Sequence, residues 1–353
     1  MKNFLLAKIS PDLSKDDNAA LKGAAILMIV LHNFCHWILP VTENEYSFEL
    51  NKSMMWLENF CNGGPHVILN FLSFWGHYGV AVFLFLSGFG LVRKYESPTS
   101  GTLEFLPFMK HNYLKLWKLL FIAVIIQCFI DFDIWNFVLL TFASNLIPEA
   151  ELVNGPWWFF SLIIQCYCLY ALCFYRKNNI RPVIAALISL SILVIALILD
   201  APEDIFRYIR LNIFGWVLPF ASGVIFARKR FEIPVWGCLV ALVLFFLSEF
   251  NAFAWTIAPA LVCIGFIPLM KMVKGKIRAF LSFTGVISAA MFVIHPLTRN
   301  PIIYYIYDEY DFPGKEYLCI FVYIALTYLF AYGYHRILKK NKQTFFIYNH
   351  NRR

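Results

Sequence analysis

The sequence predicts an all-α protein, a polytopic bundle of membrane helices, from its composition, its apolar segments and the distribution of its basic residues. Of the 353 residues, 60% are hydrophobic and only 15% are charged. A soluble domain carries about 25% charged residues. A bilayer-spanning helix needs about 20 predominantly apolar residues, and such runs recur along the whole chain. We therefore expect a single membrane domain over residues 1–353.

Ten apolar segments are long enough to predict transmembrane helices. They cover approximately residues 20–39, 67–92, 107–130, 156–175, 182–199, 208–227, 233–249, 252–271, 279–298 and 317–338. A shorter apolar piece, Ile134–Ile147, is expected to form an interfacial helix at a membrane surface or to re-enter the membrane. The longest gaps, 40–66 and 131–155, are too short for a soluble domain.

The basic residues orient these segments. When the N-terminus is placed in the cytoplasm and the spans alternate, 25 of the 30 Lys and Arg residues fall on the cytoplasmic side. Cytoplasmic loops of membrane proteins carry such an excess of Lys and Arg. The pattern predicts cytoplasmic N- and C-termini and a retained first span. The net charge of +8 is then explained by the anionic cytoplasmic leaflet, and it does not predict nucleic-acid binding.

The first span, Leu21–Trp37, carries polar side chains at membrane depth. Lys22 begins it, and His32 and His36 lie one helical turn apart near its far end. Residues four apart share a helix face. Ionisable groups inside a membrane indicate a functional site by default, and imidazole exchanges protons near neutral pH. The alternative is that both histidines are structural and hydrogen-bonded to neighbouring helices.

The third span begins with a basic cluster of Lys110, Lys115 and Lys118. Positive-inside anchoring produces clusters of this kind. The same residues could also hold phosphate groups, because Lys binds phosphate as a point charge. Both interpretations remain open from the residues alone.

Other spans contribute single polar groups. His77 lies in the second span among small residues, and Gln165 lies about ten residues into the fourth span, which begins near Trp158. The nine cysteines include no CxxC pair, and Cys166 and Cys168 are too close for the usual zinc spacing. The sequence therefore predicts no metal site.

Five stretches together resemble the integral-membrane acyltransferase family 3, which includes bacterial O-acetyltransferases of surface polysaccharides. They are LKGAAILMIVLHN at 21–33, GVAVFLFLSGFGL at 79–91, the basic residues at 110–118, the segment from 158 to 167, and SAAMFVIHP at 288–296. The resemblance implies a ten-span bundle that takes an acyl group from acyl-CoA at the cytoplasmic face. The group would pass to a hydroxyl of a glycan or glycolipid. We expect a stand-alone member without the extracytoplasmic hydrolase-like domain of many relatives.

The resemblance also implies roles for individual residues. His32, or else His36, would deprotonate the acceptor hydroxyl. Acetyl-CoA or another acyl-CoA would be the donor, with no metal, and the protein would lie in a bacterial inner membrane. The CoA phosphates would be held by Lys22, Lys110, Lys115 and Lys118. The substrate cavity would be lined by Asn33, His77, Trp158, Gln165 and Tyr167.

The sequence departs from the family pattern at two places. The family shows Arg or Lys, ten intervening residues and then His, but this spacing from Lys22 lands on Asn33, with His32 one position earlier. Ile163 and Ile164 stand where many relatives carry two Glu residues. These departures leave a catalytically inactive relative as one alternative. A transporter or flippase for a lipid-linked sugar or small anion, with proton-coupling histidines, is another.

Overall fold

The computed structural model describes residues 5–10, 12–38, 43–64, 66–130, 155–229 and 231–350. The described residues are mainly helical, and the two strands among them, β1 (Lys8–Ile9) and β2 (Ile233–Pro234), form a short antiparallel pair. The predicted all-α class is therefore confirmed.

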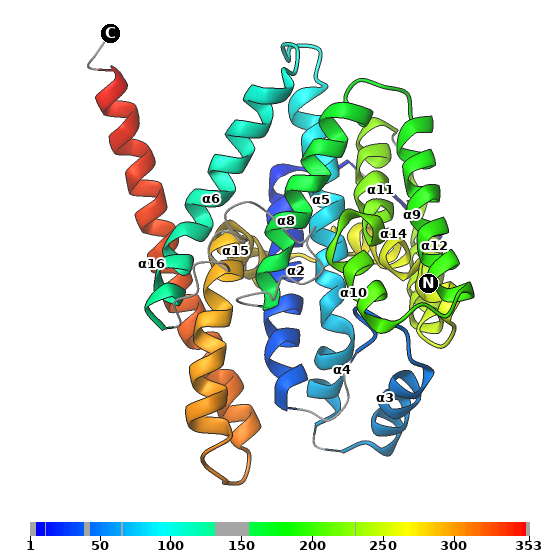
Figure 1. Ribbon diagram of the computed structural model, residues 1–353, viewed down its shortest axis with the longest axis vertical. Coiled ribbons are helices and arrows are strands. Elements are labelled where there is room, and N and C mark those ends of the chain that lie inside the picture. Colours follow the sequence, from blue (N-terminus) through cyan, green and yellow to red (C-terminus); the bar gives the residue numbers. More distant parts are fainter. Residues whose placement is uncertain are drawn as a thin grey trace.

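Two long helices, α2 (Lys15–Ile38) and α15 (Gly275–Ile302), pack along each other (Figure 1). Glycines permit the close approach. A Cβ atom on Gly285 would lie 1.8 Å from the Ala19 carbonyl oxygen, and one on Gly23 would lie 1.9 Å from that of Leu281. Small residues at helix contacts are typical of membrane bundles, because they let the backbones approach closely. This contact fixes the helix that carries His32.

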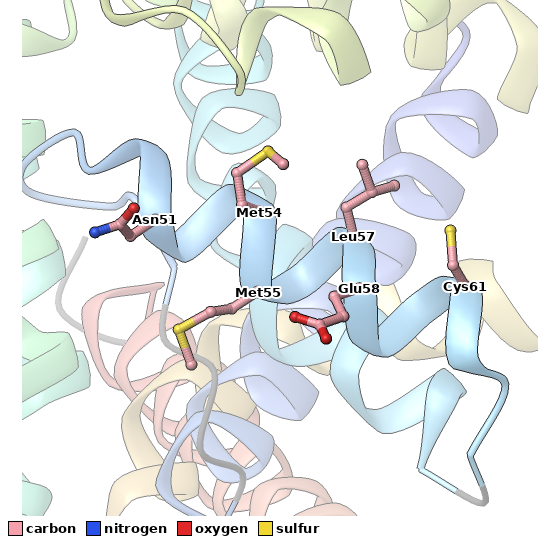
Figure 2. A pocket seen from close by; sticks show the side chains of 6 residues that line it. All are labelled: Asn51, Met54, Met55, Leu57, Glu58 and Cys61. Atoms are coloured by element: carbon pink, nitrogen blue, oxygen red, sulfur yellow. The ribbon is translucent and has the colours of Figure 1, made fainter.

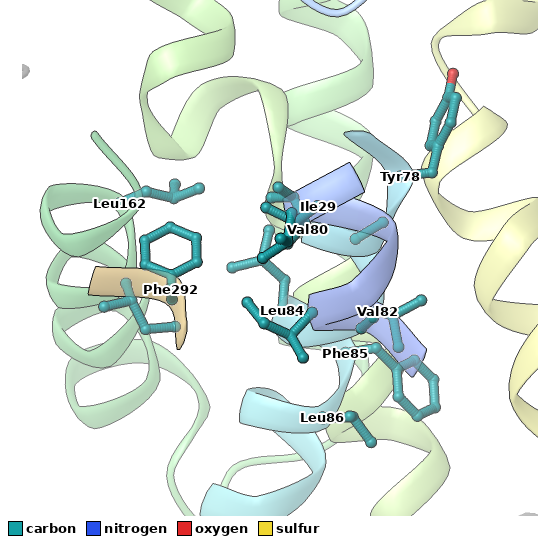
Figure 3. Close-up of a cluster of buried hydrophobic side chains, with 14 of the residues drawn as sticks. Ile29, Tyr78, Val80, Val82, Leu84, Phe85, Leu86, Leu162 and Phe292 are labelled. Carbon is teal, nitrogen blue, oxygen red and sulfur yellow. The ribbon is translucent and has the colours of Figure 1, made fainter. Parts of the chain in front are cut away.

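A second continuous span runs beside α2. It consists of α4 (Val67–Trp75), the 3₁₀ turn η1 (Gly76–Tyr78) and α5 (Gly79–Tyr95). Helix α5 packs against α11 (Val217–Arg228). Figure 3 shows the apolar core here, where side chains of α5 meet Ile29, Leu162 and Phe292. These buried apolar side chains pack α2 and α5 against each other.

The other described elements complete the bundle. They are α6 (Phe105–Ile130), η2 (Gly155–Trp157), α8 (Trp158–Leu169), η3 (Tyr170–Phe174), α9 (Ile180–Ile198), α10 (Glu203–Leu211), η4 (Ile213–Gly215), α12 (Val235–Ser248), α13 (Ala252–Trp255), α14 (Ala258–Met270), η5 (Ile303–Tyr307) and α16 (Lys315–His350).

Six of the helical stretches in the described part are long and apolar enough to cross a membrane. They are Lys15–Ile38, Val67–Tyr95, Gly155–Phe174, Ile180–Ile198, Gly275–Tyr307 and Lys315–Lys340. The helices α11, α12 and α14 are apolar but shorter. The expected interfacial helix Ile134–Ile147 lies outside the described residues.

Two predicted spans are interrupted. The segment 208–227 is divided between α10, η4 and α11, and 252–271 is divided between α13 and α14. The first break has a local cause, since the chain turns at Gly215, where a Cβ atom would lie 3.0 Å from the Ile209 carbonyl oxygen. At the second, the Asn251 side chain caps the short helix α13. Both breaks bring polar residues into the protein interior.

The segment 40–66, predicted as a connection between spans, contains the helix α3 (Leu50–Asn62). Ser53 and Trp56 face the protein core. Figure 2 shows the outer side, where Met54, Met55 and Leu57 are exposed beside a shallow depression of about 490 Å³. An amphipathic helix of this kind suits a membrane interface.

Candidate functional site

His32 lies in the interior of the bundle, on the face of α2 that contacts α4 and η1. Its side chain is 3% exposed, and its Nδ1 lies 2.7 Å from the Ser73 carbonyl oxygen. A carbonyl only accepts, so Nδ1–H is the donor. Nε2 therefore points to the opposite side of the ring. His36 follows one turn later, with the two ring centroids 5.3 Å apart.

Two carboxylates from the segment after α2 face these imidazoles. His32 Nε2 lies 3.7 Å from Glu43 Oε1 and 3.9 Å from Glu45 Oε2. His36 Nδ1 lies 3.3 Å from each Glu43 oxygen. Burial disfavours the ionised form of Glu43, but the neighbouring imidazoles outweigh it and hold the pKa of the Glu43 carboxyl below its usual range. Glu43 is therefore a buried carboxylate.

His77 completes a group of three histidines. Its ring centroid is 5.6 Å from that of His32, and its Nδ1 is 3.0 Å from the Phe74 carbonyl oxygen. The buried Nε2 of His77 has no hydrogen-bond partner among the described residues. Gly76 makes this approach feasible, because a Cβ there would lie 2.5 Å from the His32 Cβ atom.

Distant elements hold the acidic segment in place. The Arg210 Nε of α10 donates to the Glu45 carbonyl oxygen at 3.0 Å, and the Trp255 Nε1 of α13 donates to the Asn44 carbonyl oxygen at 2.8 Å. The fully buried Arg210 guanidinium lies over the ring of Trp255, 4.3 Å from its centroid. Arg210 and Trp255 lie near the breaks in the predicted spans 208–227 and 252–271.

A third carboxyl group lies behind the acidic segment. Glu249 follows the end of α12 and is fully buried. It accepts a hydrogen bond from the Tyr78 hydroxyl, and the Asn44 amide lies 3.4 Å away. Ser53 of α3 donates to the Glu249 backbone carbonyl at 2.5 Å. The site is thus surrounded by a polar network of residues from six segments of the chain.

The predicted cavity residues have different positions. Trp158 lies at the site, since its ring is 6.5 Å from Tyr46 and 6.0 Å from Trp216, which stacks near Arg210. Gln165 instead bridges to the α10–η4 junction: it donates to Asn212 at 2.7 Å and accepts from the Ile213 amide at 2.9 Å.

The remaining two predicted cavity residues have their own partners. Asn33 donates to the Ile29 carbonyl at 2.9 Å, and Arg299 Nη1 lies 3.5 Å from its side-chain oxygen. Tyr167 packs with Phe108 of α6, at a ring separation of 6.2 Å. Asn33 and Tyr167 therefore each make a contact that the sequence does not reveal.

The predicted CoA-binding lysines lie toward the other end of α2. Lys22 precedes His32 by ten residues, which is roughly 15 Å along a helix. Lys110, Lys115 and Lys118 are exposed on α6. The positive charges of Lys22 and Lys115 are close enough to repel each other. Lys110, Lys115 and Lys118 form the basic surface of α6, and Lys115 lies near the half-buried Lys22 at the start of α2.

Sequence reasoning missed four ionisable residues of the site: Glu43, Glu45, Arg210 and Glu249. Glu43 and Glu45 read as ordinary loop acids, and their burial depends on contacts across the fold. Arg210 offered a signal, because it lies in the apolar segment 208–227 and an ionisable residue there indicates function or pairing.

The arrangement can hold and transfer protons in a water-poor interior. Two imidazoles face two carboxylates, as in sites where a carboxylate stabilises the imidazolium that forms when His accepts a proton. One donor atom each from His32, His36 and Glu43 lie within 4.8 Å of one another, which is also close enough to hold a metal ion.

Comparison with known proteins identifies the family. The model of a family described as an acyltransferase domain matches residues 19–336, nearly the whole chain. No curated protein and no solved structure matches the chain. The matched region contains both α2, with its histidines, and the basic surface of α6. The chain therefore belongs to the membrane acyltransferase family 3 and is an acyltransferase that transfers groups other than aminoacyl groups.

Proposed function

We propose that the protein transfers an acetyl group from cytoplasmic acetyl-CoA, or another acyl-CoA, to a hydroxyl of a surface glycan or glycolipid. The observation that supports this most directly is His32, buried in a membrane bundle with Nδ1–H bound to Ser73 and Nε2 facing Glu43 and Glu45. Buried proton-transfer groups at membrane depth are costly and indicate function.

The donor would bind at the basic surface. Lys22, Lys110, Lys115 and Lys118 would hold the CoA phosphates as point charges. This end of α2 would lie at the cytoplasmic face of a bacterial inner membrane, with both termini inside, because Lys and Arg concentrate there. The thioester would then extend along α2 toward His32.

The acceptor hydroxyl would react at the histidines. As its oxygen attacks the thioester carbonyl, the hydroxyl proton would pass to His32 Nε2, and Glu43 would stabilise the imidazolium. A new C–O ester bond forms, the C–S bond breaks, and the CoA thiolate takes up the proton. His36, half-buried and beside Glu43, is the second proton acceptor in reach of this position.

Substitution tests this assignment. His32→Ala and His36→Ala would be expressed one at a time beside His66→Ala, a control whose ring stacks on Tyr317 outside both proposed sites. Acetyl esters on extracted glycans and glycolipids would be measured by mass spectrometry. General-base catalysis contributes about 10²- to 10⁴-fold, so loss of at least a hundredfold is expected for His32→Ala and little change for His66→Ala. Full acetylation in both His32→Ala and His36→Ala would refute the proposed base.

A second measurement separates catalysis from transport. Purified wild-type protein would be incubated with acetyl-CoA and membrane glycolipid extract, and free CoA thiol would be followed with a thiol reagent. Thiol release together with new acetyl ester supports transfer. Proton-coupled movement of a lipid-linked sugar without thiol release would support a transporter instead.

A further inference from the structure

We propose that His32, His36 and Glu43 form a binding site for a divalent transition metal ion of the zinc class. The metal site is inferred from geometry alone. The effect of the metal on catalysis rests on the proposed acyl transfer, and metal binding and this effect are measured separately.

The spacing of the donor atoms fits coordination better than direct hydrogen bonding. Zinc binds His nitrogen and carboxylate oxygen at about 2.0–2.2 Å in tetrahedral geometry, which places ligand atoms roughly 3.3 Å apart. Glu43 Oε1 lies 3.3 Å from His36 Nδ1 and 3.7 Å from His32 Nε2. Charge-assisted N–H···O bonds are shorter, at about 2.7–2.9 Å. The three atoms thus surround a position for a small cation.

The surroundings of His32 prepare it as a ligand. Its Nδ1–H donates to the Ser73 carbonyl, so that in the neutral ring the Nε2 lone pair is directed at Glu43 and Glu45. Metal-binding histidines almost always donate their other ring N–H to a carbonyl or carboxylate. A lone pair facing two buried carboxylates is unfavourable unless a proton or a metal cation lies between them.

The charge and access of the site fit a transition metal. Imidazole and carboxylate donors together suit zinc, whereas calcium and magnesium require oxygen ligands. The His36 side chain is 28% exposed, which provides an entry route from the surface. Glu45, whose Oε2 lies 3.9 Å from His32 Nε2, is the nearest further carboxylate for the open position.

Metal binding and proton transfer would compete. A metal ion on His32 Nε2 uses the lone pair that accepts the hydroxyl proton in the proposed reaction. Zinc is therefore expected to inhibit acyl transfer, with half-maximal inhibition at the concentration that half-saturates the site, and a chelator is expected to restore activity. Transfer that is unchanged at saturating zinc would contradict this competition.

Metal binding itself is measured without any acyl acceptor. Full-length protein in detergent would be stripped with chelator, loaded with Zn²⁺ or Co²⁺, desalted, and assayed by elemental analysis and by Co²⁺ absorption in the visible range. Stoichiometric metal with a tetrahedral Co²⁺ spectrum is expected. Wild-type protein that retains no metal would overturn the proposal.

Matched variants locate the metal. His36→Ala and Glu43→Gln each remove one ligand. Both are expected to weaken binding by more than the roughly 10- to 100-fold that follows loss of an outer-shell partner. His111→Ala removes an exposed histidine elsewhere and should bind like wild type. Unchanged affinity in both ligand variants would overturn the assignment, with monodisperse elution of each variant as the folding control.

Discussion

At the scale of single residues, contacts between residues far apart in the sequence bury the charged groups of the site. Arg210 and Glu45 are 165 positions apart, yet the Arg210 Nε donates to the Glu45 carbonyl. The guanidinium is fully buried between the rings of Trp216 and Trp255. It therefore compensates the buried acids Glu45 and Glu249 and holds the acidic segment beside His32.

Replacement of Arg210 tests this role. Arg210→Met keeps much of the side-chain volume but leaves buried carboxylates without their compensating charge. The substitution also removes the hydrogen bond to the Glu45 carbonyl, and buried polar groups that lose their partner are costly, so a clear decrease in the thermal unfolding temperature is expected. Arg207→Met, one turn earlier on α10 and exposed, is the matched control and should change little. Equal shifts in the two variants would contradict a special role for Arg210.

The same residues show the limit of sequence reasoning about the site. That His32 and His36 share a face of one helix follows from their spacing, and the structure places their rings 5.3 Å apart. Glu43 and Glu45 could not be found in this way, because long-range contacts from α10 and α13 bury their segment. Gln165 is predicted to line the cavity, and the structure shows that it donates to Asn212, a contact that helix periodicity cannot reveal.

At the scale of elements, close packing of α2 on α15 positions the histidines. The side of α15 that meets α2 carries Gly285, and the matching position on α2 is Gly23. Any side chain at Gly285 would push the two backbones apart, because its Cβ would meet the Ala19 carbonyl oxygen at 1.8 Å. The contact between these helices therefore tolerates glycine alone.

Gly285→Ala is expected to destabilise the protein. Overpacking costs about 1–3 kcal/mol, here with a backbone atom that cannot move aside, and metal or substrate binding at His32 should weaken too. Gly90→Ala is the same substitution in another membrane helix, α5, where no described atom lies within 4 Å of the added Cβ. Thermal unfolding of the two variants in the same detergent should separate them, and similar unfolding temperatures would refute the packing argument.

Helix positions were the most predictable part of the fold. The predicted segments 20–39 and 182–199 correspond to α2 (Lys15–Ile38) and α9 (Ile180–Ile198), because hydropathy alone specifies a membrane helix. Hydropathy could not locate the interruption near Gly215, which depends on turn geometry and on burial of Arg210. It also gave no sign of α3, whose buried side carries Ser53 and Trp56.

At the scale of the whole molecule, the distribution of basic residues predicts that the basic surface faces the cytoplasm and that α3 lies on the opposite side. Cys61 lies on α3. Among the cysteines whose burial the structure describes, it alone is exposed. A membrane-impermeant maleimide should therefore label Cys61 in intact spheroplasts. Cys61→Ser should lose this label, and Ser97→Cys, at the proposed cytoplasmic end of α5, should add a label only after lysis. Cys61 labelling that requires lysis would reverse the orientation.

The whole molecule combines a basic surface near one end of α2 with a buried His–Glu site further along the same helix. This separation suits a reaction in which donor and acceptor approach from opposite faces of the membrane. Lys22 and His32, ten residues apart on α2, mark the two regions. The family membership establishes acyl transfer, and the proposed direction of transfer follows from the charge distribution.

Labelled acyl transfer in liposomes shows whether His32 accepts the hydroxyl proton. Wild type and His32→Ala, reconstituted at equal amounts in liposomes containing membrane glycolipid extract, would receive isotope-labelled acetyl-CoA on the side of the basic surface. We expect wild type to form labelled acetyl ester and release CoA in equal amounts, and His32→Ala to lose at least a hundredfold of both. Equal ester formation by the two proteins would contradict the assignment of His32 as the proton acceptor in acyl transfer.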